Sequence, residues 1–213
     1  MTTVGILGGT GPAGRGVAVR LAAAGHDVVL GSRDVERAAQ VASALGTSGI
    51  SGAANDDAAN CEIVIVATPW DSAVATVRAL REALAGKIVI SMVNALTKEG
   101  REMLPLYPPR GSMAAQIASA LATSRVVGAF HHLPASEMEN LESGLNADVV
   151  IFGDDAEART RVEGLVNEMP GLRAVIAGTM SLASAVEAFT AVCISINIRH
   201  KAHSYVTLAG LSI

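Results

Sequence analysis

Aromatic residues are scarce in this chain of 213 residues and make up only 3% of it. So few rings cannot build the stacking platforms on which single-stranded nucleic acids lie. Basic residues do not predominate either, since the formal net charge is −4, whereas proteins that track phosphate backbones are usually basic. The composition therefore argues against a nucleic-acid-binding protein.

Cysteine is also rare, with Cys61 and Cys193 far apart in apolar surroundings. A zinc site would need Cys and His clustered at short spacings, and no such cluster is present in the sequence. We therefore expect two buried thiols and no metal site. Two unpaired cysteines also fit a reducing cytoplasm, which is the location we expect.

Long hydrophobic runs are limited to one stretch, AVIAGTMSLASAVEAFTAVCISINI, which covers residues 174–198 and precedes a basic flank. It is long enough to span a bilayer. However, Glu187 lies near its middle, and a charge there makes insertion costly. We therefore expect no membrane association, and instead a buried helix over Ser181–Ile198 at a subunit or domain interface.

Short apolar runs alternate with helical patterns along most of the chain. Strands are expected at Thr3–Gly8, Asp27–Gly31, Ile63–Thr68, Lys87–Met92, Val126–His131 and Asp148–Phe152. Helices are expected at Gly14–Ala24, Val35–Leu45, Trp70–Leu84 and Met113–Leu121. This alternation predicts an α/β fold with a doubly wound parallel sheet. We assign residues 1–125 to a nucleotide-binding domain and residues 126–213 to a smaller second domain.

A glycine motif, G-x-G-x-x-G, lies between the first strand and the first helix, at Gly9, Gly11 and Gly14. In this context the first glycine permits a tight turn, the second lets the backbone approach a pyrophosphate, and the third lets helix and strand pack closely. The free N–H groups of the helix would bind the phosphates. The sequence therefore predicts a Rossmann-type dinucleotide site.

The end of the second strand indicates which dinucleotide is bound. NAD enzymes usually carry an acidic residue there, whereas this chain has Ser32 and Arg33, with Arg37 one helical turn later. Asp34 is expected to cap the next helix. A hydroxyl and two guanidinium groups would hold a 2′-phosphate, so NADP(H) is favoured. The alternative is that both arginines are ordinary surface residues.

Further candidate residues follow later strands. The strand predicted at Ile63–Thr68 runs directly into Thr68, Pro69 and Trp70, beside which the nicotinamide ring would lie, although Trp70 could instead pack in the core. Asn94 follows the next strand and could offer its amide to the nicotinamide or its ribose.

His131 and His132 lie at the C-terminal end of the strand predicted at Val126–His131. Neighbouring residues on a strand point to opposite faces, so the two rings would not converge on one metal ion. One ring is expected to face a site, and the sequence shows no carboxylate partner for acid–base work. A Tyr-x-x-x-Lys proton donor is also lacking. Direct hydride exchange between two cofactors needs mainly alignment and exclusion of water.

The chain resembles the NADPH-dependent reductases of the deazaflavin coenzyme F420. The resemblance covers nearly the whole chain and rests on GILGGTGPAGRG, GSRDVER, VIVATPWDSA, SMVNAL, PPRGSMAAQIA, VVGAFHHLPA and GDDAEAR. It implies a small C-terminal domain over the cofactor cleft, a homodimer formed through the C-terminal helices, and hydride transfer between NADP(H) and F420.

The resemblance also implies roles for single residues. The phosphate loop falls on Thr10, Gly11, Pro12 and Ala13, and the 2′-phosphate clamp on Ser32, Arg33 and Arg37. His131 and Leu133 would pack on the deazaflavin and position it, while Asn94, Ala135 and the tail near Thr207 would lie beside the cofactors. Arg110, Arg199 and Lys201 are candidate contacts to the anionic tail of F420, or simply a solvated helix end.

Two other functions fit the same motifs. One is an NADPH-dependent imine or ketone reductase of the pyrroline-carboxylate-reductase type on the same fold. The other is a non-catalytic subunit that senses NADP. If NADPH oxidation depends strictly on added deazaflavin, the protein has the F420 function and is not an imine or ketone reductase. NADPH binding without turnover on any acceptor would indicate the sensing subunit.

Overall fold

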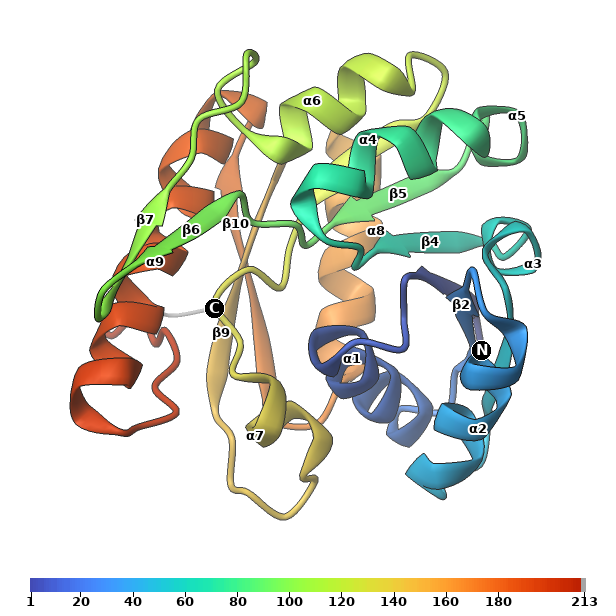
Figure 1. The fold of residues 1–213 in the computed structure, drawn as a ribbon, viewed down its shortest axis with the longest axis horizontal. Helices are drawn as coiled ribbons and strands as arrows, with labels where there is room; N and C mark the ends of the chain where they lie inside the picture. The colour runs from blue at the N-terminus through green and yellow to red at the C-terminus, as the bar shows by residue number, and fades with distance from the viewer. Residues whose placement is uncertain (212–213) are drawn as a thin grey trace.

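An eight-stranded sheet forms the centre of the molecule, in the order β10-β9-β8-β5-β4-β1-β2-β3 (Figure 1). The computed structural model describes residues 1–211. Neighbouring strands are parallel except for β8 and β9, which pair antiparallel. The strands are β1 (Thr3–Leu7), β2 (Asp27–Ser32), β3 (Ile50–Ala54), β4 (Ile63–Val66), β5 (Ile88–Ser91), β8 (Arg125–Gly128), β9 (Ala147–Gly153) and β10 (Leu172–Gly178).

Helices cover both faces of this sheet. One core cluster joins strand residues to residues of α1 (Pro12–Ala23), α2 (Val35–Leu45), α7 (Ala135–Glu139) and α8 (Ala156–Glu168). The other cluster draws on α3 (Asn55–Ala59), α4 (Trp70–Ala79), α5 (Arg81–Leu84) and α6 (Met113–Ala120). The doubly wound α/β architecture expected from the alternating pattern is thereby confirmed.

The best-predicted strands are those buried on both faces. Every residue of Ile63–Val66 and Ile88–Ser91 is buried, and all but Ser91 are apolar, as expected of a parallel sheet between two helix layers. β3 (sequence ISGAA) escaped prediction because its residues are small. Close packing against α2 accounts for the glycine in this strand. A Cβ on Gly52 would lie 2.1 Å from the backbone carbonyl carbon of Ala38 on α2, so no larger residue fits there.

The sheet continues without a break past residue 125, since β8 pairs with β5 and β9 pairs with β8. The C-terminal strands therefore extend the same sheet that the first half of the chain forms. β8 ends at Gly128, so His131 and His132 lie beyond the strand predicted to contain His131. The division of the chain into two domains at residues 125 and 126 stays a proposal.

A long apolar helix and a hairpin lie together at one side of the molecule (Figure 1). The helix is α9 (Ala183–His200), which follows the short 3-10 helix η1 (Met180–Leu182), and the antiparallel hairpin is β6 (Leu96–Glu99) and β7 (Glu102–Pro105). The segment Met180–His200 is long and apolar enough to cross a membrane, with a mean hydropathy of 1.6. Only 28% of its apolar stretch is buried inside the molecule. The apolar run at residues 174–198 is thus divided, because its first five residues belong to β10.

Candidate functional site

The turn between β1 and α1 has the geometry of a phosphate-binding loop. The amide of Gly9 donates to the carbonyl oxygens of Ile6 (3.1 Å) and Gly31 (2.9 Å), which ties the loop to the end of β2. The left-handed residue of the turn is Gly8, with a φ of 68°. The prediction that Gly9 permits the tight turn is therefore corrected by one residue, to Gly8. Gly9 is needed for close packing instead, because a Cβ added to it would lie 2.8 Å from the carbonyl oxygen of Ile6.

Gly11 and Gly14 serve different purposes. A Cβ on Gly14 would lie 2.7 Å from the carbonyl oxygen of Gly9, so this glycine lets α1 approach the loop as predicted. A Cβ on Gly11 would have only one neighbour within 4 Å, the Gly8 carbonyl oxygen at 3.8 Å. Gly11 is also in ordinary extended conformation, with φ −74°. The fold itself therefore leaves open space at Gly11, which a phosphate approaching the helix N-terminus could use.

Asn55 also shapes the loop, and sequence reasoning missed it. Its side-chain oxygen accepts a hydrogen bond of 3.1 Å from the Gly8 amide, across 47 residues of sequence. This contact fixes Gly8 at the start of the turn. Asn55 begins α3, directly after the unpredicted strand β3, so its place beside the loop depends on a strand pairing that the sequence did not reveal.

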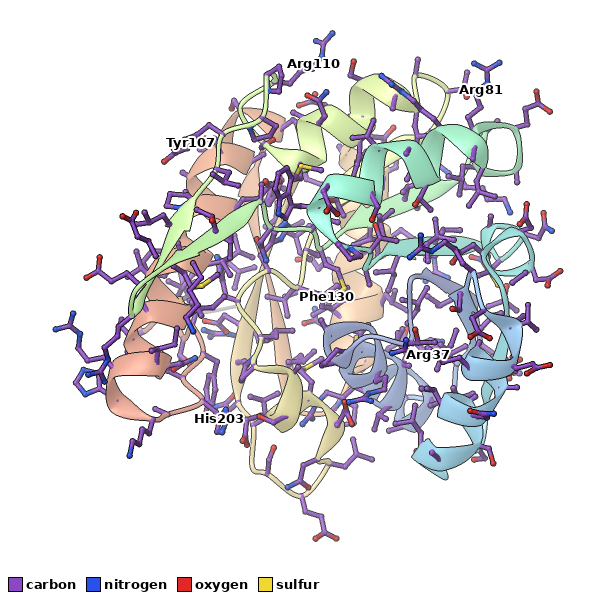
Figure 2. All side chains as sticks on the ribbon, in the orientation of Figure 1. Arg37, Arg81, Tyr107, Arg110, Phe130 and His203 are labelled. Atoms are coloured by element: carbon purple, nitrogen blue, oxygen red, sulfur yellow. The ribbon has the colours of Figure 1, made fainter. Side chains whose placement is uncertain are left out.

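Ser32, Arg33 and Arg37 gather where β2 passes into α2. Both arginines are exposed, and Arg37 is labelled in Figure 2. Asp34 caps α2 as expected, because its carboxylate accepts a 3.0 Å hydrogen bond from the Arg37 amide. The Ser32 hydroxyl accepts from the Asp34 amide at 3.1 Å. The carboxylate is thus engaged by its own helix, and the guanidinium groups remain available for an anion.

Thr68, Pro69 and Trp70 follow β4 at the same edge of the sheet. Pro69 is the N-cap of α4 and Trp70 its first residue. Trp70 is 40% exposed, which rules out the alternative that it packs in the core. Thr68 lies against the glycine loop, because a Cβ on Gly8 would be 2.7 Å from the Thr68 methyl group.

A cavity of about 280 Å³ opens next to the loop at the ends of β5 and β8. Its wall brings together residues from the start of α1, the loops after β5 and β8, α9 and the tail: Ala13, Met92, Asn94, Phe130, His131, His132, Leu133, Pro134, Ala135, Thr190, Cys193, Ile194, Asn197 and Ser204. Parts of the chain nearly 200 residues apart thus share one cavity, which is the strongest candidate for a functional site.

Thr190 on α9 fixes the side chain of Asn94 in this cavity. The Asn94 amide nitrogen donates to the carbonyl oxygen of His131 at 3.3 Å. The Thr190 hydroxyl lies 3.1 Å from the Asn94 side-chain oxygen and 3.2 Å from the same carbonyl. Asn94 is therefore held between two segments, and Thr190 is a site residue that the sequence pattern did not single out.

The two histidines are both buried. Phe130, directly before them, has a φ of 67°, which is unusual for a residue with a side chain. Burial lowers the pKa of His131 to about 3, with the neighbouring His132 acting in the same direction and the Ala129 carbonyl opposing it. His132 Nε2 is bound to the Val186 carbonyl at 2.8 Å. The His131 imidazole is thus neutral and fully buried, although the residue is part of the cavity wall.

A carboxylate that the sequence did not reveal lies near His131, although no hydrogen bond joins the two side chains. Glu187 lies one turn before Thr190 on α9, and its Oε1 is 4.0 Å from His131 Nε2. The sequence could not reveal this proximity, because 56 residues separate the two positions and no pattern predicts how α9 packs. In residues 1–211, no group of three or more His, Cys, Asp or Glu side chains could hold a metal ion.

The remaining predicted residues are distributed unevenly. Leu133 and Ala135 line the cavity. Thr207 does not line it, and its hydroxyl binds the Asn146 carbonyl at 3.1 Å. Ser204 is the tail residue at the cavity, where Asn197 holds it through a hydroxyl hydrogen bond of 2.6 Å. A cofactor contact at Thr207 stays a prediction.

A buried arginine secures the wall that contains Leu133 and Ala135. Arg20 of α1 is 1% exposed and donates to the carbonyl oxygens of Glu137 (2.6 Å), Asn140 (3.1 Å) and Pro170 (2.5 Å). Gly16 allows the close approach of α1 and α7, because its added Cβ would lie 2.5 Å from the Met138 Cβ. The loop helix and the cavity wall are therefore joined as one unit.

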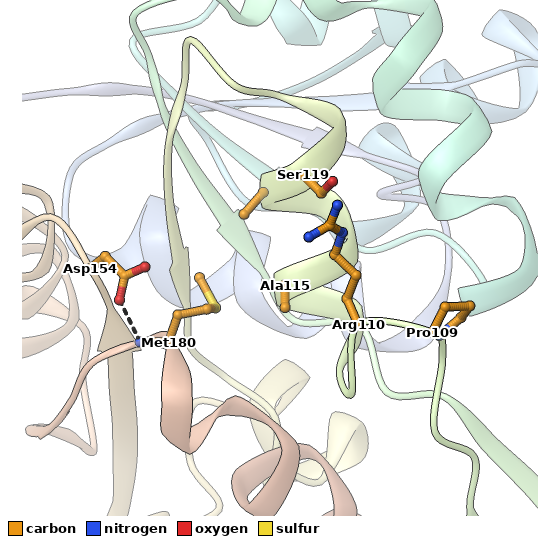
Figure 3. A pocket seen from close by; sticks show the side chains of 7 residues that line it. Pro109, Arg110, Ala115, Ser119, Asp154 and Met180 are labelled. Carbon is orange, nitrogen blue, oxygen red and sulfur yellow. Dashed lines mark hydrogen bonds between the residues drawn. The ribbon is translucent and has the colours of Figure 1, made fainter.

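Arg110, one of the candidate anion contacts, lines a different cavity of about 640 Å³ between α6 and η1 (Figure 3). Asp154 lies across it and accepts from the Met180 amide at 3.0 Å, so this cavity contains charges of both signs. Arg199 lies 3.6 Å from Glu102 of the hairpin. Neither arginine lines the cavity at the glycine loop.

Comparison with known proteins places this site in context. Residues 3–95 match the model of a family described as "NADP oxidoreductase coenzyme F420-dependent". The F420-dependent NADP reductase of Methanocaldococcus jannaschii is 35% identical over 209 residues, 93% of each chain. That of Methanothermobacter marburgensis is 30% identical over 211 residues, again 93% of each chain.

The fold agrees with this relationship. A crystal structure described as a putative F420-dependent NADP reductase from Arthrobacter sp. FB24 superposes with a TM-score of 0.83 at 26% identity. The alignment covers 96% of this chain and 97% of that chain. The similarity therefore extends over the glycine loop, the cavity and the C-terminal helix together.

Proposed function

Because the chain belongs to the family of coenzyme F420-dependent NADP oxidoreductases, we propose that it passes a hydride directly between NADP(H) and F420 in the cavity beside the glycine loop. The enzyme is an F420-dependent NADP oxidoreductase. NADPH supplies the hydride and the oxidised deazaflavin accepts it, or the reverse. The residues of the chain bind both molecules, align them and exclude water.

The glycine loop and the end of β2 would hold NADP(H). Gly11 leaves room for a pyrophosphate at the α1 N-terminus, where the loop residues Thr10, Pro12 and Ala13 surround it. Ser32, Arg33 and Arg37 would bind the 2′-phosphate, since an anion there meets two exposed guanidinium groups and an Asp34 carboxylate already used as a helix cap. Thr68, Pro69 and Trp70 would form the wall beside the nicotinamide.

The cavity of about 280 Å³ carries the proposal, because Ala13 from the phosphate helix and the residues beyond β8 line the same space. A molecule in this cavity would lie directly beside a nucleotide bound at the loop. Leu133 and Ala135 offer apolar surface for a flat ring, and Asn94 offers polar atoms held in place by Thr190. His131 would act through its backbone and its packing, because its imidazole is buried.

Strict dependence of NADPH oxidation on F420 tests this function. We expect NADPH oxidation by the purified enzyme to require added F420, with one NADPH consumed for each F420 reduced, as followed by absorbance. Cyclic imines and ketones serve as the control acceptors. Turnover of NADPH on an imine without F420 would contradict the proposal in favour of an imine reductase. NADPH binding without turnover on any acceptor would indicate a sensing subunit.

We also propose a homodimer formed through α9. The helix exposes Phe189 (47%), Val192 (47%) and Ile196 (44%) on one face. Together with Leu104, Pro105 and the 65% exposed Tyr107 (Figure 2), these residues line an apolar groove of about 580 Å³ between α9 and β7. Apolar surface of this kind is typical of contacts between subunits. A second copy of the chain would bury it.

Val192→Glu is expected to convert the dimer into a monomer, because it places a charge within the proposed interface. Light scattering coupled to size-exclusion chromatography measures the mass directly. Val35→Glu is the matched control, because Val35 is 49% exposed on α2. A wild-type monomer, or a Val192→Glu dimer, would contradict the interface.

A cytoplasmic location also belongs to the proposal. Cys61 and Cys193 are both free and buried, which fits a reducing compartment. The small second domain over residues 126–213 is likewise proposed, as the part that supplies His131, Leu133, Ala135 and α9 to the cavity.

A further inference from the structure

Glu187 is a buried carboxylate that joins two helices. It lies on α9 and is only 5% exposed. Its Oε2 accepts a 2.7 Å hydrogen bond from the Met113 amide, and its Oε1 accepts a 2.8 Å bond from the Ala114 amide. These are the first two residues of α6, where free N–H groups and the helix dipole both favour an anion. The two helices are therefore linked through one side chain.

The same carboxylate lies behind the cavity. Oε1 is 4.0 Å from His131 Nε2, and the His131 side chain is 0% exposed. The other side of the imidazole lies near Phe152 of β9, with ring centroids 5.4 Å apart. Among residues 1–211, neither ring nitrogen of His131 has a hydrogen-bond partner of ordinary geometry. Glu187 is therefore the carboxylate nearest to this ring, which also lies near the Ala129 carbonyl.

Glu187 is also close to the groups that line the cavity. Thr190, one helical turn further along the same face of α9, binds both Asn94 and the His131 carbonyl. A shift of α9 relative to α6 would therefore move Thr190, and with it Asn94 and the backbone of His131. Whatever holds α9 against α6 also holds this part of the cavity wall.

We propose that Glu187 is a positioning residue for the hydride acceptor, which fastens α9 to the N-terminus of α6 and supports His131 from behind so that Thr190, Asn94 and Leu133 keep their places. The inference rests on the proposed function, because it assigns this cavity to F420. Glu187 does not line the cavity, so it acts through these neighbours.

Protonation gives the proposal a signature that simple packing lacks. Burial raises the pKa of Glu187 to about 7, against the two amide hydrogen bonds, which lower it. The titratable group nearest to it is His131, which His132 follows in the chain. Burial lowers the pKa of both histidines. A protonated carboxyl would lose acceptor capacity towards the α6 amides. Affinity for F420 should therefore rise as pH increases through about 7.

Glu187→Gln tests the proposal through binding as well as turnover. Glutamine keeps the size of the side chain but offers one acceptor where two amides need one each. We expect the Kd and KM for F420 to rise about tenfold, with the Kd for NADPH unchanged within about twofold, as measured by fluorescence titration. The pH dependence of the ratio between variant and wild-type affinities isolates Glu187, because the ionisation of F420 cancels.

Asp155→Asn is the matched control. Asp155 also caps a helix, since its carboxylate accepts from the Ala158 amide of α8 at 2.7 Å, but it does not line the cavity. This control should leave F420 affinity and its pH dependence unchanged. If Glu187→Gln does not fold, Glu187→Asp decides, because it keeps the charge but is too short to reach both amides.

Three results would overturn the inference. A folded Glu187→Gln with wild-type F420 affinity would remove the role, and so would an equal loss for NADPH and F420. A variant-to-wild-type affinity ratio that does not change with pH would also contradict it. Wild-type enzyme that binds F420 without turnover would instead count against the proposed function, while the Kd still tests Glu187.

Discussion

Gly11→Val is expected to abolish NADPH binding while leaving the fold intact. The fold itself places only the Gly8 carbonyl, at 3.8 Å, near an added Cβ at this position, and the backbone conformation suits any residue. A valine side chain would therefore fill the space that the pyrophosphate needs. We expect the Kd for NADPH to rise at least about 100-fold, which corresponds to about 2.7 kcal/mol, with an unchanged melting temperature.

Gly14→Val provides the contrast. A Cβ at Gly14 would lie 2.7 Å from the Gly9 carbonyl oxygen, so this variant should lower the melting temperature markedly. Titration of NADPH fluorescence and thermal unfolding, measured on both variants, separate ligand space from packing. Wild-type NADPH affinity in Gly11→Val would show that the nucleotide does not approach the loop.

Arg33→Ala is expected to weaken NADPH binding about 30-fold and NADH binding by less than about threefold. The 2′-phosphate gains charge-assisted hydrogen bonds from a guanidinium group, each worth about 2 kcal/mol, and NADH lacks this phosphate. Competitive titration of both nucleotides against the wild-type enzyme measures the change in selectivity.

Arg81→Ala is the control for this variant. Arg81 is an exposed arginine on α5 (Figure 2). Its substitution by alanine removes the same charge from the molecule and therefore corrects for long-range electrostatics. An equal loss of NADPH and NADH affinity in Arg33→Ala would mean that Arg33 supports the site in general and does not recognise the phosphate.

The sequence predicted those parts of the fold that depend on local pattern. Continuous apolar runs gave β4 and β5, and the glycine spacing gave the loop before α1. β3 was missed because its residues are small, and at Gly52 this is required by close packing against α2. The antiparallel pairing of β8 with β9 was missed because strand direction depends on contacts that no local pattern records.

The candidate site divides in the same way. The motif residues Gly11, Ser32 and Arg33 could be found from their spacing along the chain. Glu187 could not be found from the sequence, because its contacts depend on the packing of α9 against α6, which places the carboxylate near His131. The position of the His131 ring was likewise set by Phe130, where the backbone adopts an unusual conformation for a non-glycine residue.

Direct hydride transfer is the central claim, and a single-turnover reaction with NADPH deuterated at the transferred position of C4 tests it most directly. Mass spectrometry of the reduced F420 follows the label in ordinary water. The proposed function predicts that reduced F420 retains one deuterium from NADPH. Loss of the label to solvent, or NADPH oxidation without any reduced F420, would contradict the account.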